Sequence, residues 1–323
     1  MSLWRTTISP DAYRRVTAMA LVALGAIIVT GAAVRLTSSG MGCPTWPSCE
    51  GGSLVPRGAT GGHGWIEFLN RVFTGIVSVA VALAVLGSRR RDPVRADLTR
   101  WSWGLVAGVF AQALLGGLVV FLHVTPIAVA GHYLLSAVLV WNGVVLHHKA
   151  SEPEPTGADR ERQRRRRLAS PAVFSRSRAV VALAGVVLVT GTFVTGSGPH
   201  GGDEAADRLP FAVTTVARIH SLSVWLFLAA VLVLLVQLGR GDADGEVMGR
   251  GRVLVALIAA QGALGYLQYF TGVPELLVGG HILGSVLVWV AALRFHLGLT
   301  APLTGTVPTV GHLRPAPVAG AVP

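Results

Sequence analysis

The sequence predicts an all-α integral membrane protein of eight transmembrane helices, arranged as two similar four-helix bundles. Of the 323 residues, 52% are hydrophobic and 13% are charged, whereas soluble globular domains carry roughly 25% charged residues. Uncharged stretches such as 16–34 are long enough to cross a hydrocarbon core of about 30 Å as a helix. Basic residues then recur at every second boundary between these stretches. Composition, span length and charge pattern therefore favour a membrane fold over a water-soluble one.

Eight apolar segments meet the length that a membrane span requires. They cover residues 16–36, 66–88, 101–122, 126–147, 178–197, 212–238, 252–272 and 276–297. Arginines precede the first segment and follow the second, fourth and sixth. Because basic loops stay on the cytoplasmic side, we expect a multi-pass cell-membrane protein with both termini cytoplasmic. The segments left outside are 37–65, 123–125, 198–211 and 273–275.

The net charge of +11 raises the question of a nucleic-acid partner. The arginines cluster in short segments between apolar runs, and no pattern of aromatic residues suited to base stacking accompanies them. The charge is therefore interpreted as membrane topology. The expected surroundings are the lipid bilayer, with no nucleic acid.

Two halves of the chain share a pattern of polar and small residues. Gln112-Ala-Leu-Leu-Gly116 precedes Gly131-His132, and Gln261-Gly-Ala-Leu-Gly265 precedes Gly280-His281, both shifted by 149 residues. Val29-Thr30-Gly31 is likewise echoed by Val189-Thr190-Gly191. With four spans in each half, the repeats are parallel, related by an axis along the membrane normal. The predicted units are an N-terminal half 1–148, a flexible cytoplasmic linker 149–178, a C-terminal half 179–300 and a disordered tail 301–323.

Three histidines, His132, His220 and His281, lie inside predicted spans. Imidazoles are rare there and require a partner, a cavity or a metal. The three spans run in the same direction, and each histidine lies within about two turns of its outer end at ~1.5 Å per residue. His220 and His281 could face each other across the second half and bind a haem iron from both sides. Hydrogen bonding between helices is the alternative interpretation.

The first half differs chemically at the position equivalent to His220. Asn70 occupies that position, and Glu67 shares its helix face three residues earlier. Both lie at the outer end of the second span, in register with His132. Glu67 could instead be solvated by lipid headgroups, and Asn70 could simply bond a neighbouring helix in a half that has lost its haem.

Cys43 and Cys49 are the only cysteines and belong to the first outer loop. A disulfide is plausible in an oxidising compartment, and a reactive, readily reduced pair is also possible. Two cysteines are too few for a closed zinc site. His63, His123 and His200 fall in outer loops, and the last two could reach a haem propionate.

Several motifs resemble the haem A synthase family over almost the entire membrane region. The longest runs Arg35-Leu-Thr-Ser-Ser-Gly40-Met-Gly-Cys43-Pro-Thr-Trp46-Pro-Ser-Cys49, and the others are Glu67-Phe-Leu-Asn70-Arg71, Gln112-Ala-Leu-Leu-Gly116-Gly117, Gly131-His132, Ile219-His220 and Gly280-His281. The Cys-Pro-x-Trp-Pro-x-Cys loop is specific, whereas each histidine pair is weak alone. The resemblance implies a membrane oxidoreductase that converts the C8 methyl group of haem O to a formyl group by successive hydroxylations. The product, haem A, serves terminal oxidases.

The resemblance also implies a role for each site residue. Haem B would be the cofactor of the C-terminal half, with His220 and His281 as axial ligands. Haem O would bind the N-terminal half at His132, beside Asn70 and Arg71. Many relatives read Glu-x-x-His-Arg where this chain has Asn70, so His132 is the one clear axial ligand expected for the substrate. Glu67 is expected to influence iron or move protons, and haem O synthase and an electron donor are the expected protein partners.

A di-haem b-type electron carrier is an alternative from another functional class. Such a carrier would have two complete histidine pairs, usually near opposite membrane faces, whereas this sequence offers one pair and one incomplete site. A repeat-built transporter is a third possibility. The sequence shows neither a pair of broken helices nor a buried carboxylate–lysine set to support it.

Overall fold

The chain folds into eight long α-helices, as the sequence predicts. The computed structural model describes residues 7–153, 166–167, 171–240 and 245–301, and each of its eight helices is long and apolar enough to cross a membrane. They are α1 (Pro10–Leu36), α2 (Gly62–Arg90), α3 (Ala96–Phe121), α4 (Pro126–Ala150), α5 (Pro171–Ser197), α6 (Val213–Arg240), α7 (Gly245–Phe270) and α8 (Glu275–Leu297). The strands β1 (Arg166–Arg167) and β2 (Thr300–Ala301) form one short antiparallel pair. The predicted all-α membrane fold class is confirmed.

Several helices begin before the apolar segment that was expected to span the bilayer. α1 starts at Pro10, where the Ser9 hydroxyl accepts a 3.2 Å hydrogen bond from the backbone N–H of Ala12. A hydroxyl cap followed by proline is a typical helix start. α5 starts at Pro171, earlier than expected, so the end of the predicted linker 149–178 is helical. The remaining predictions for the linker and the tail concern 154–165, 168–170 and 302–323, which lie outside the described residues.

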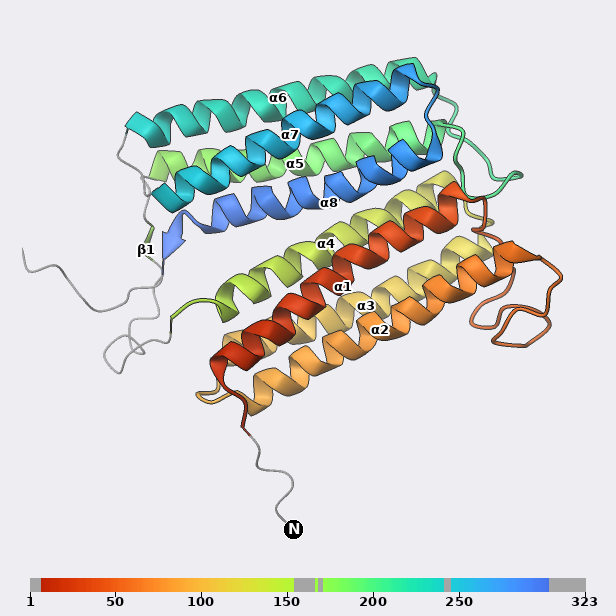
Figure 1. Ribbon diagram of the computed structural model, residues 1–323, viewed down its shortest axis with the longest axis horizontal. Coiled ribbons are helices and arrows are strands. Elements are labelled where there is room, and N and C mark those ends of the chain that lie inside the picture. Colours follow the sequence, from red (N-terminus) through yellow and green to blue (C-terminus); the bar gives the residue numbers. More distant parts are fainter. Residues whose placement is uncertain (1–6, 154–165, 168–170, 241–244, 302–323) are drawn as a thin grey trace, which may run out of the picture.

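The helices form two four-helix groups that lie side by side (Figure 1). In the first group α1 packs against α2 and α4, and α3 packs against α2 and α4. In the second group α5 packs against α6 and α8, and α7 packs against α6 and α8. α2 and α4 are therefore diagonal partners across one bundle, as α6 and α8 are across the other. This arrangement places side chains of diagonal helices opposite each other around a common centre.

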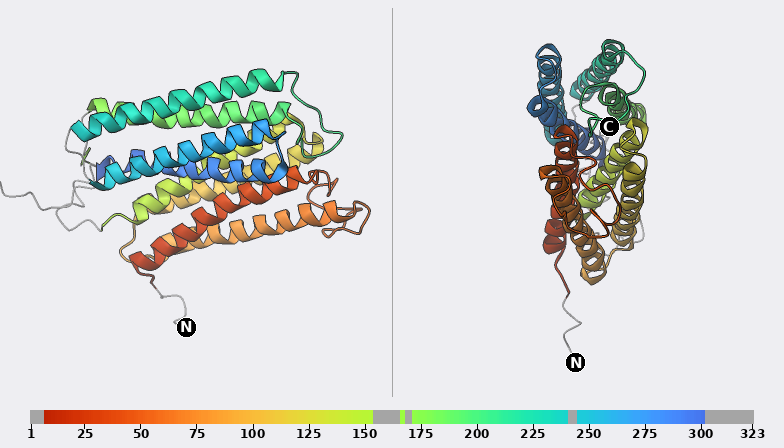
Figure 2. Two further views of the ribbon diagram at one scale, coloured as in Figure 1. Left: turned by 45° about the horizontal axis from the view of Figure 1, so that its top comes forward. Right: turned by 90° about the vertical axis from the view of Figure 1, so that its right-hand side faces the viewer.

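The two groups join mainly through α1, α4, α5 and α8 (Figure 2). Between α4 and α8, the Tyr133 hydroxyl lies 2.9 Å from Ser285 Oγ. The Trp289 indole N–H also donates a 2.9 Å hydrogen bond to the carbonyl of Ala137. Val286 and Leu293 of α8 belong to the buried core of the first group. The second half therefore contributes directly to the packing of the first.

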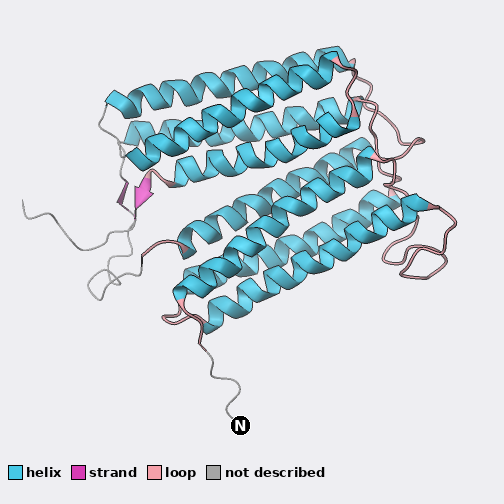
Figure 3. Ribbon diagram, viewed as in Figure 1, coloured by secondary structure: helices cyan, strands magenta, loops and turns pink. Residues whose placement is uncertain are grey.

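The loops divide between two ends of the molecule. We name one end the cysteine-loop face; it carries residues 37–61, 122–125, 198–212 and 271–274, drawn at the right of Figure 3. The opposite end, named the arginine face, carries residues 7–9 and the loop 91–95. Both long loops, 37–61 and 198–212, belong to the cysteine-loop face. The histidines singled out from the sequence lie in the helix turns next to this same face.

Candidate functional site

The second half brings two imidazoles together across the bundle. The ring centres of His220 on α6 and His281 on α8 are 6.4 Å apart, with an angle of 76° between the ring planes. A metal bonds an imidazole nitrogen at about 2.0–2.1 Å, and the ring centre lies roughly 1.2 Å behind that nitrogen. Two imidazoles on opposite sides of one iron therefore have ring centres about 6.4 Å apart. The observed spacing fits a six-coordinate haem iron.

Neighbouring helices fix the orientation of both rings. Thr190 Oγ1 lies 3.1 Å from Nδ1 of His220. Gly265 of α7 lies against the His281 ring, so close that an added Cβ would be 3.2 Å from Cε1. Nδ1 of His281 is buried, whereas neither Nε2 is buried or hydrogen-bonded to a described residue. The accessible Nε2 atoms are the nitrogens that an iron would need.

The first half repeats these surroundings around His132. An added Cβ at Gly116 would be 3.3 Å from Cε1 of His132, which corresponds to the contact at Gly265. The side-chain amide of Gln112 donates a 3.0 Å hydrogen bond to the carbonyl of His132, and Gln261 does the same to His281 at 2.8 Å. The polar residues that served as repeat markers in the sequence therefore make equivalent contacts in the two halves.

Asn70 occupies the surroundings that hold His220 in the other half. The Thr30 hydroxyl donates a 2.8 Å hydrogen bond to Oδ1 of Asn70, as Thr190 contacts Nδ1 of His220. With Oδ1 bonded to Thr30, the NH₂ group of Asn70 is the part of the amide left without a hydrogen bond to a described residue. The interhelical bond expected of a merely structural asparagine is thus present. The equivalent bond also orients His220, so the bond does not distinguish the two interpretations.

A protein-only metal centre does not fit the described residues. In the part of the chain that the structure describes, no three His, Cys, Asp or Glu side chains gather closely enough to hold a metal ion. A haem needs only one or two protein ligands, because the porphyrin itself supplies four nitrogens. The histidines therefore suit a haem and do not suit a zinc or di-metal site.

Cys43 and Cys49 form a disulfide, and the loop that contains it is bound to α2. Glu67 accepts a 2.7 Å hydrogen bond from the backbone N–H of Cys43 and is paired with the guanidinium of Arg71. Arg71 in turn donates to three loop carbonyls, those of Cys43, Thr45 and Ser48. Glu67 and Arg71 therefore anchor the disulfide loop in this structure.

The same loop reaches over α3 next to the His132 surroundings. The Trp46 indole packs on Gly117, where an added Cβ would be 2.9 Å from the ring. Gly117 follows Gly116, the glycine that contacts His132. The loop thus covers part of the first bundle at the cysteine-loop face.

Glu50 is a buried loop carboxylate that the sequence analysis did not identify. The Thr60 hydroxyl donates to Oε1 at 2.8 Å, and the backbone N–H of Arg57 donates to Oε2 at 2.7 Å. These donors, the Thr60 hydroxyl first, lower the pKa of Glu50 below its ordinary value because they favour the charged form. Glu50 therefore organises residues 57–60 as an ionised acceptor.

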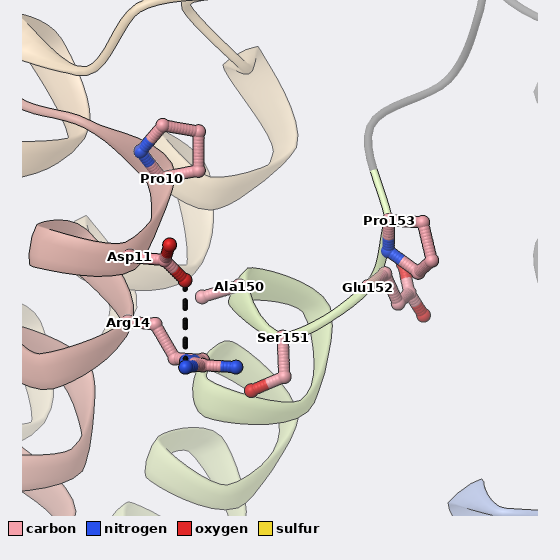
Figure 4. A pocket seen from close by; sticks show the side chains of 7 residues that line it. All are labelled: Pro10, Asp11, Arg14, Ala150, Ser151, Glu152 and Pro153. Atoms are coloured by element: carbon pink, nitrogen blue, oxygen red, sulfur yellow. Dashed lines mark ion pairs between the residues drawn. The ribbon is translucent and has the colours of Figure 1, made fainter.

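Two cavities differ in their relation to the histidines. One, of about 570 Å³, is mostly apolar. Its lining comes from α3, α4 and the loop before α6, and includes Leu115, Leu118, Gly131 and Arg208. The other, of about 220 Å³, lies at the arginine face beside the Asp11–Arg14 ion pair (Figure 4). Neither cavity is lined by a histidine, and the first is the one bordered by Gly131, the residue before His132.

Four other described histidines contact hydroxyls or carbonyls. On the cysteine-loop face, His63 Nδ1 lies 2.9 Å from Ser39 Oγ, and His200 Nε2 lies 2.8 Å from the carbonyl of Val273. Near the arginine face, His147 pairs with Thr17 at 3.0 Å and His296 with Ser177 at 2.8 Å. Within the described residues, His220 and His281 are the one pair of histidine rings in mutual contact.

Comparison with known proteins bears directly on this site. A family model described as cytochrome oxidase assembly protein matches residues 14–61 and 59–293, which together make up most of the chain. The chain belongs to this family. It is 35% identical over 103 residues to a haem A synthase of Lysinibacillus sphaericus and 32% identical over 114 residues to one of Geobacillus kaustophilus. The resemblance to haem A synthases predicted from the sequence is therefore confirmed.

The matched segments cover only part of each relative. They span 32% of this chain and 28% of the Lysinibacillus protein, and 34% of both chains in the Geobacillus comparison. A protohaem IX farnesyltransferase of Chloroflexus aurantiacus is 33% identical over 172 residues, which are 50% of this chain and 28% of that protein. The chain thus spans about a third or less of the length of these curated relatives.

In this member of the cytochrome oxidase assembly protein family, several residues gain a role that sequence reasoning missed. Thr30 and Thr190 were noted as repeat markers, yet each contacts the side chain at a candidate haem position. The recurrence of Thr-Gly at the start of both halves was the signal that could have identified them. Nothing comparable marked Glu50, whose donors come from its own loop.

Proposed function

We propose that the chain is a haem A synthase, which oxidises the C8 methyl group of haem O to a formyl group by successive hydroxylations. The observation that carries this proposal is the 6.4 Å spacing between the ring centres of His220 and His281. Equivalent surroundings recur in the first half, where His132 corresponds to His281 and Asn70 corresponds to His220. Similarity to haem A synthases supports the same conclusion. The haem A formed would serve terminal oxidases.

The second half is proposed to hold haem B as a resident cofactor. His220 and His281 would hold its iron from both sides, and the bound haem would supply electron transfer. Thr190 orients one ring, and Gln261 fixes the backbone of the other. These contacts suit a group that stays bound through many reaction cycles.

The first half is proposed to take haem O as the substrate. His132 would bind its iron from one side, while Asn70 presents a poor metal ligand on the diagonal helix. The substrate would therefore be held less firmly than the cofactor, as its entry and exit require. The apolar cavity lined by Leu115, Leu118 and Gly131 is proposed to hold a lipophilic substituent of this substrate.

Glu67 and Arg71 are proposed to act on the reaction through the disulfide loop. Glu67 is proposed to influence the iron or to relay protons, and Arg71 to lie beside the substrate. Both side chains are also bound to the loop that carries Trp46, so each would in addition position that loop. In that position the disulfide loop would exclude water from the substrate and help to hold the reacting methyl group.

The proposed location is the cell membrane, with the cysteine-loop face outside and both termini cytoplasmic. Arginines at the opposite face support this orientation. A farnesyltransferase acting on haem, such as the Chloroflexus relative by its name, is a fitting source of substrate, in line with the expected haem O synthase partner. An electron donor is the second protein partner proposed.

Haem analysis tests this function against the di-haem carrier. The protein is purified from cells that make haem O, its haems are extracted, and each is identified by mass. Haem B together with haem O, hydroxylated haem O or haem A is the expected result. Haem B alone, at two per chain, would refute the enzyme and favour the electron carrier.

A further inference from the structure

An arginine of the first half reaches across the boundary toward the haem ligands of the second. We propose that Arg35 binds a propionate carboxylate of the haem held between His220 and His281. The first half would then supply a residue to the cofactor site of the second half. This inference rests on the haem B site proposed above.

Contacts on two helices of the second half place Arg35 close to that site. Its Nη2 donates a 2.8 Å hydrogen bond to the carbonyl of Thr195 on α5. Thr195 follows Gly191 by four residues, and an added Cβ at Gly191 would be 3.4 Å from the His220 ring. The guanidinium therefore lies about one helical turn, roughly 5.4 Å, from the level of His220 toward the cysteine-loop face.

The residue after Arg35 gives the same position relative to α8. Leu36 Cδ1 lies 3.4 Å from an added Cβ at Gly279, which precedes His281 by two residues. The end of α1 is therefore packed against the helix turn that carries the second ligand. Arg35 is bracketed by α5 and α8 on the cysteine-loop side of both histidines.

The direction of the axial bonds determines which edge of the haem faces Arg35. Those bonds run across the bundle between α6 and α8, so the porphyrin plane must stand along the helix axes. Both propionates belong to one edge of the ring. Turned toward the middle of the bundle, they would place two anions among apolar side chains, which is costly. Turned toward the cysteine-loop face, they approach the level of Arg35.

Arg35 is also available to bind a carboxylate. Its one hydrogen bond within the described residues goes to Thr195, and no described carboxylate forms an ion pair with it. A guanidinium offers five N–H donors and matches a carboxylate with two parallel hydrogen bonds. Arginine at a helix end could extend to lipid headgroups, but this one turns toward α5, and its Cγ packs 3.5 Å from an added Cβ at Gly202.

Arg208 provides a matched control on the same face. Its guanidinium donates to the carbonyls of Pro199 and Ala206, both at 2.7 Å, within its own loop. It therefore holds residues 198–212 together and has the same charge as Arg35. Replacing it removes one positive charge from this face without removing the contact to α5.

The test compares haem B with its dimethyl ester, in which both propionates are uncharged. Apo-protein carrying His132→Ala is titrated with each porphyrin, so that only the second-half site is loaded. Adding Arg35→Gln should weaken haem B binding by about ten- to a hundred-fold, the loss expected for a charge-assisted pair, and leave ester binding and the low-spin spectrum unchanged. Arg208 lies close enough to act on Arg35 through its charge, so Arg208→Gln should change the ratio of the two affinities by less than Arg35→Gln does.

Other outcomes separate this proposal from the one on which it rests. If Arg35→Gln weakens haem B and the ester equally, the arginine stabilises the fold or binds lipid phosphate, and the proposal is overturned. If Arg35→Gln does not fold, the His132→Ala parent alone must bind the ester at least about ten-fold more weakly than haem B, and equal affinities would overturn it. If replacing His281 in the parent does not change porphyrin uptake, the cofactor assignment itself fails.

Discussion

Replacing Gly265 with alanine should weaken haem binding in the second half. The added Cβ would lie 3.2 Å from Cε1 of His281, closer than the optimum of about 3.5–4.0 Å for two carbon atoms. The ring must yield by a few tenths of an ångström toward the bundle centre. The backbone of His281 resists this movement because Gln261 holds its carbonyl at 2.8 Å.

The size of the effect follows from overpacking. Inserting a carbon into a well-packed site costs about 1–3 kcal/mol, and about 1.4 kcal/mol corresponds to ten-fold in affinity. The loss in haem affinity should therefore be roughly five- to a hundred-fold. The stability of the helix itself should not fall, because alanine favours a helix over glycine by about 1 kcal/mol.

Gly262 on the same helix supplies the control, since an added Cβ there meets no atom within 4 Å. Haem release from each purified variant into an excess of a haem-binding acceptor protein is followed by absorbance. Gly265→Ala should release haem faster than the parent, and Gly262→Ala should not. Equal release rates for the two variants would refute the claim that the Gly265 contact positions His281.

Three further predictions concern single contacts. Thr190→Val removes the 3.1 Å contact to Nδ1 of His220. A ligand with a hydrogen-bonded Nδ1–H is more basic, so losing the bond weakens the ligand and should raise the haem midpoint potential. An unchanged midpoint potential in a redox titration would contradict this. The lowered pKa of Glu50 means that its stabilisation of the loop is complete above its ordinary pKa of about 4.3 and is lost as pH falls through the lowered pKa. Limited proteolysis should show the loop loosening below about pH 4.3, and Glu50→Gln should flatten this dependence; an unaltered profile argues against the role. Cys43 and Cys49 should react with an impermeant thiol reagent on intact cells only after reduction, and labelling before reduction is inconsistent with the disulfide.

The sequence predicted the elements of this fold well because membrane spans depend on local composition. A helix must satisfy its own backbone in lipid, so apolar length and charged flanks define each span with little help from tertiary contacts. The positions of His220 and His281 could also be predicted, since parallel spans place equivalent residues at one depth. Their facing rings then followed from the diagonal placement of α6 and α8.

The contacts around the site were harder to predict because they depend on rotation and distance between helices. Glu67 was in register with His132, yet its carboxylate is bound by the disulfide loop and Arg71. Nothing in the spacing of residues revealed that the loop would fold back on α2. In the same way, Arg35 stood within a recognised motif, but its contact with Thr195 required the packing of one half against the other.

The central claim is that the first half performs the oxidation and the second half holds the cofactor. Its most direct test is haem A formation by wild-type and His132→Ala proteins in cells supplied with haem O but lacking another source of haem A. The wild type should form haem A. The variant should form none and accumulate haem O, while the low-spin spectrum that depends on His220 and His281 persists. Haem A formation by His132→Ala at the wild-type rate would contradict the account, because the substrate would then be oxidised without the proposed iron ligand of the first half.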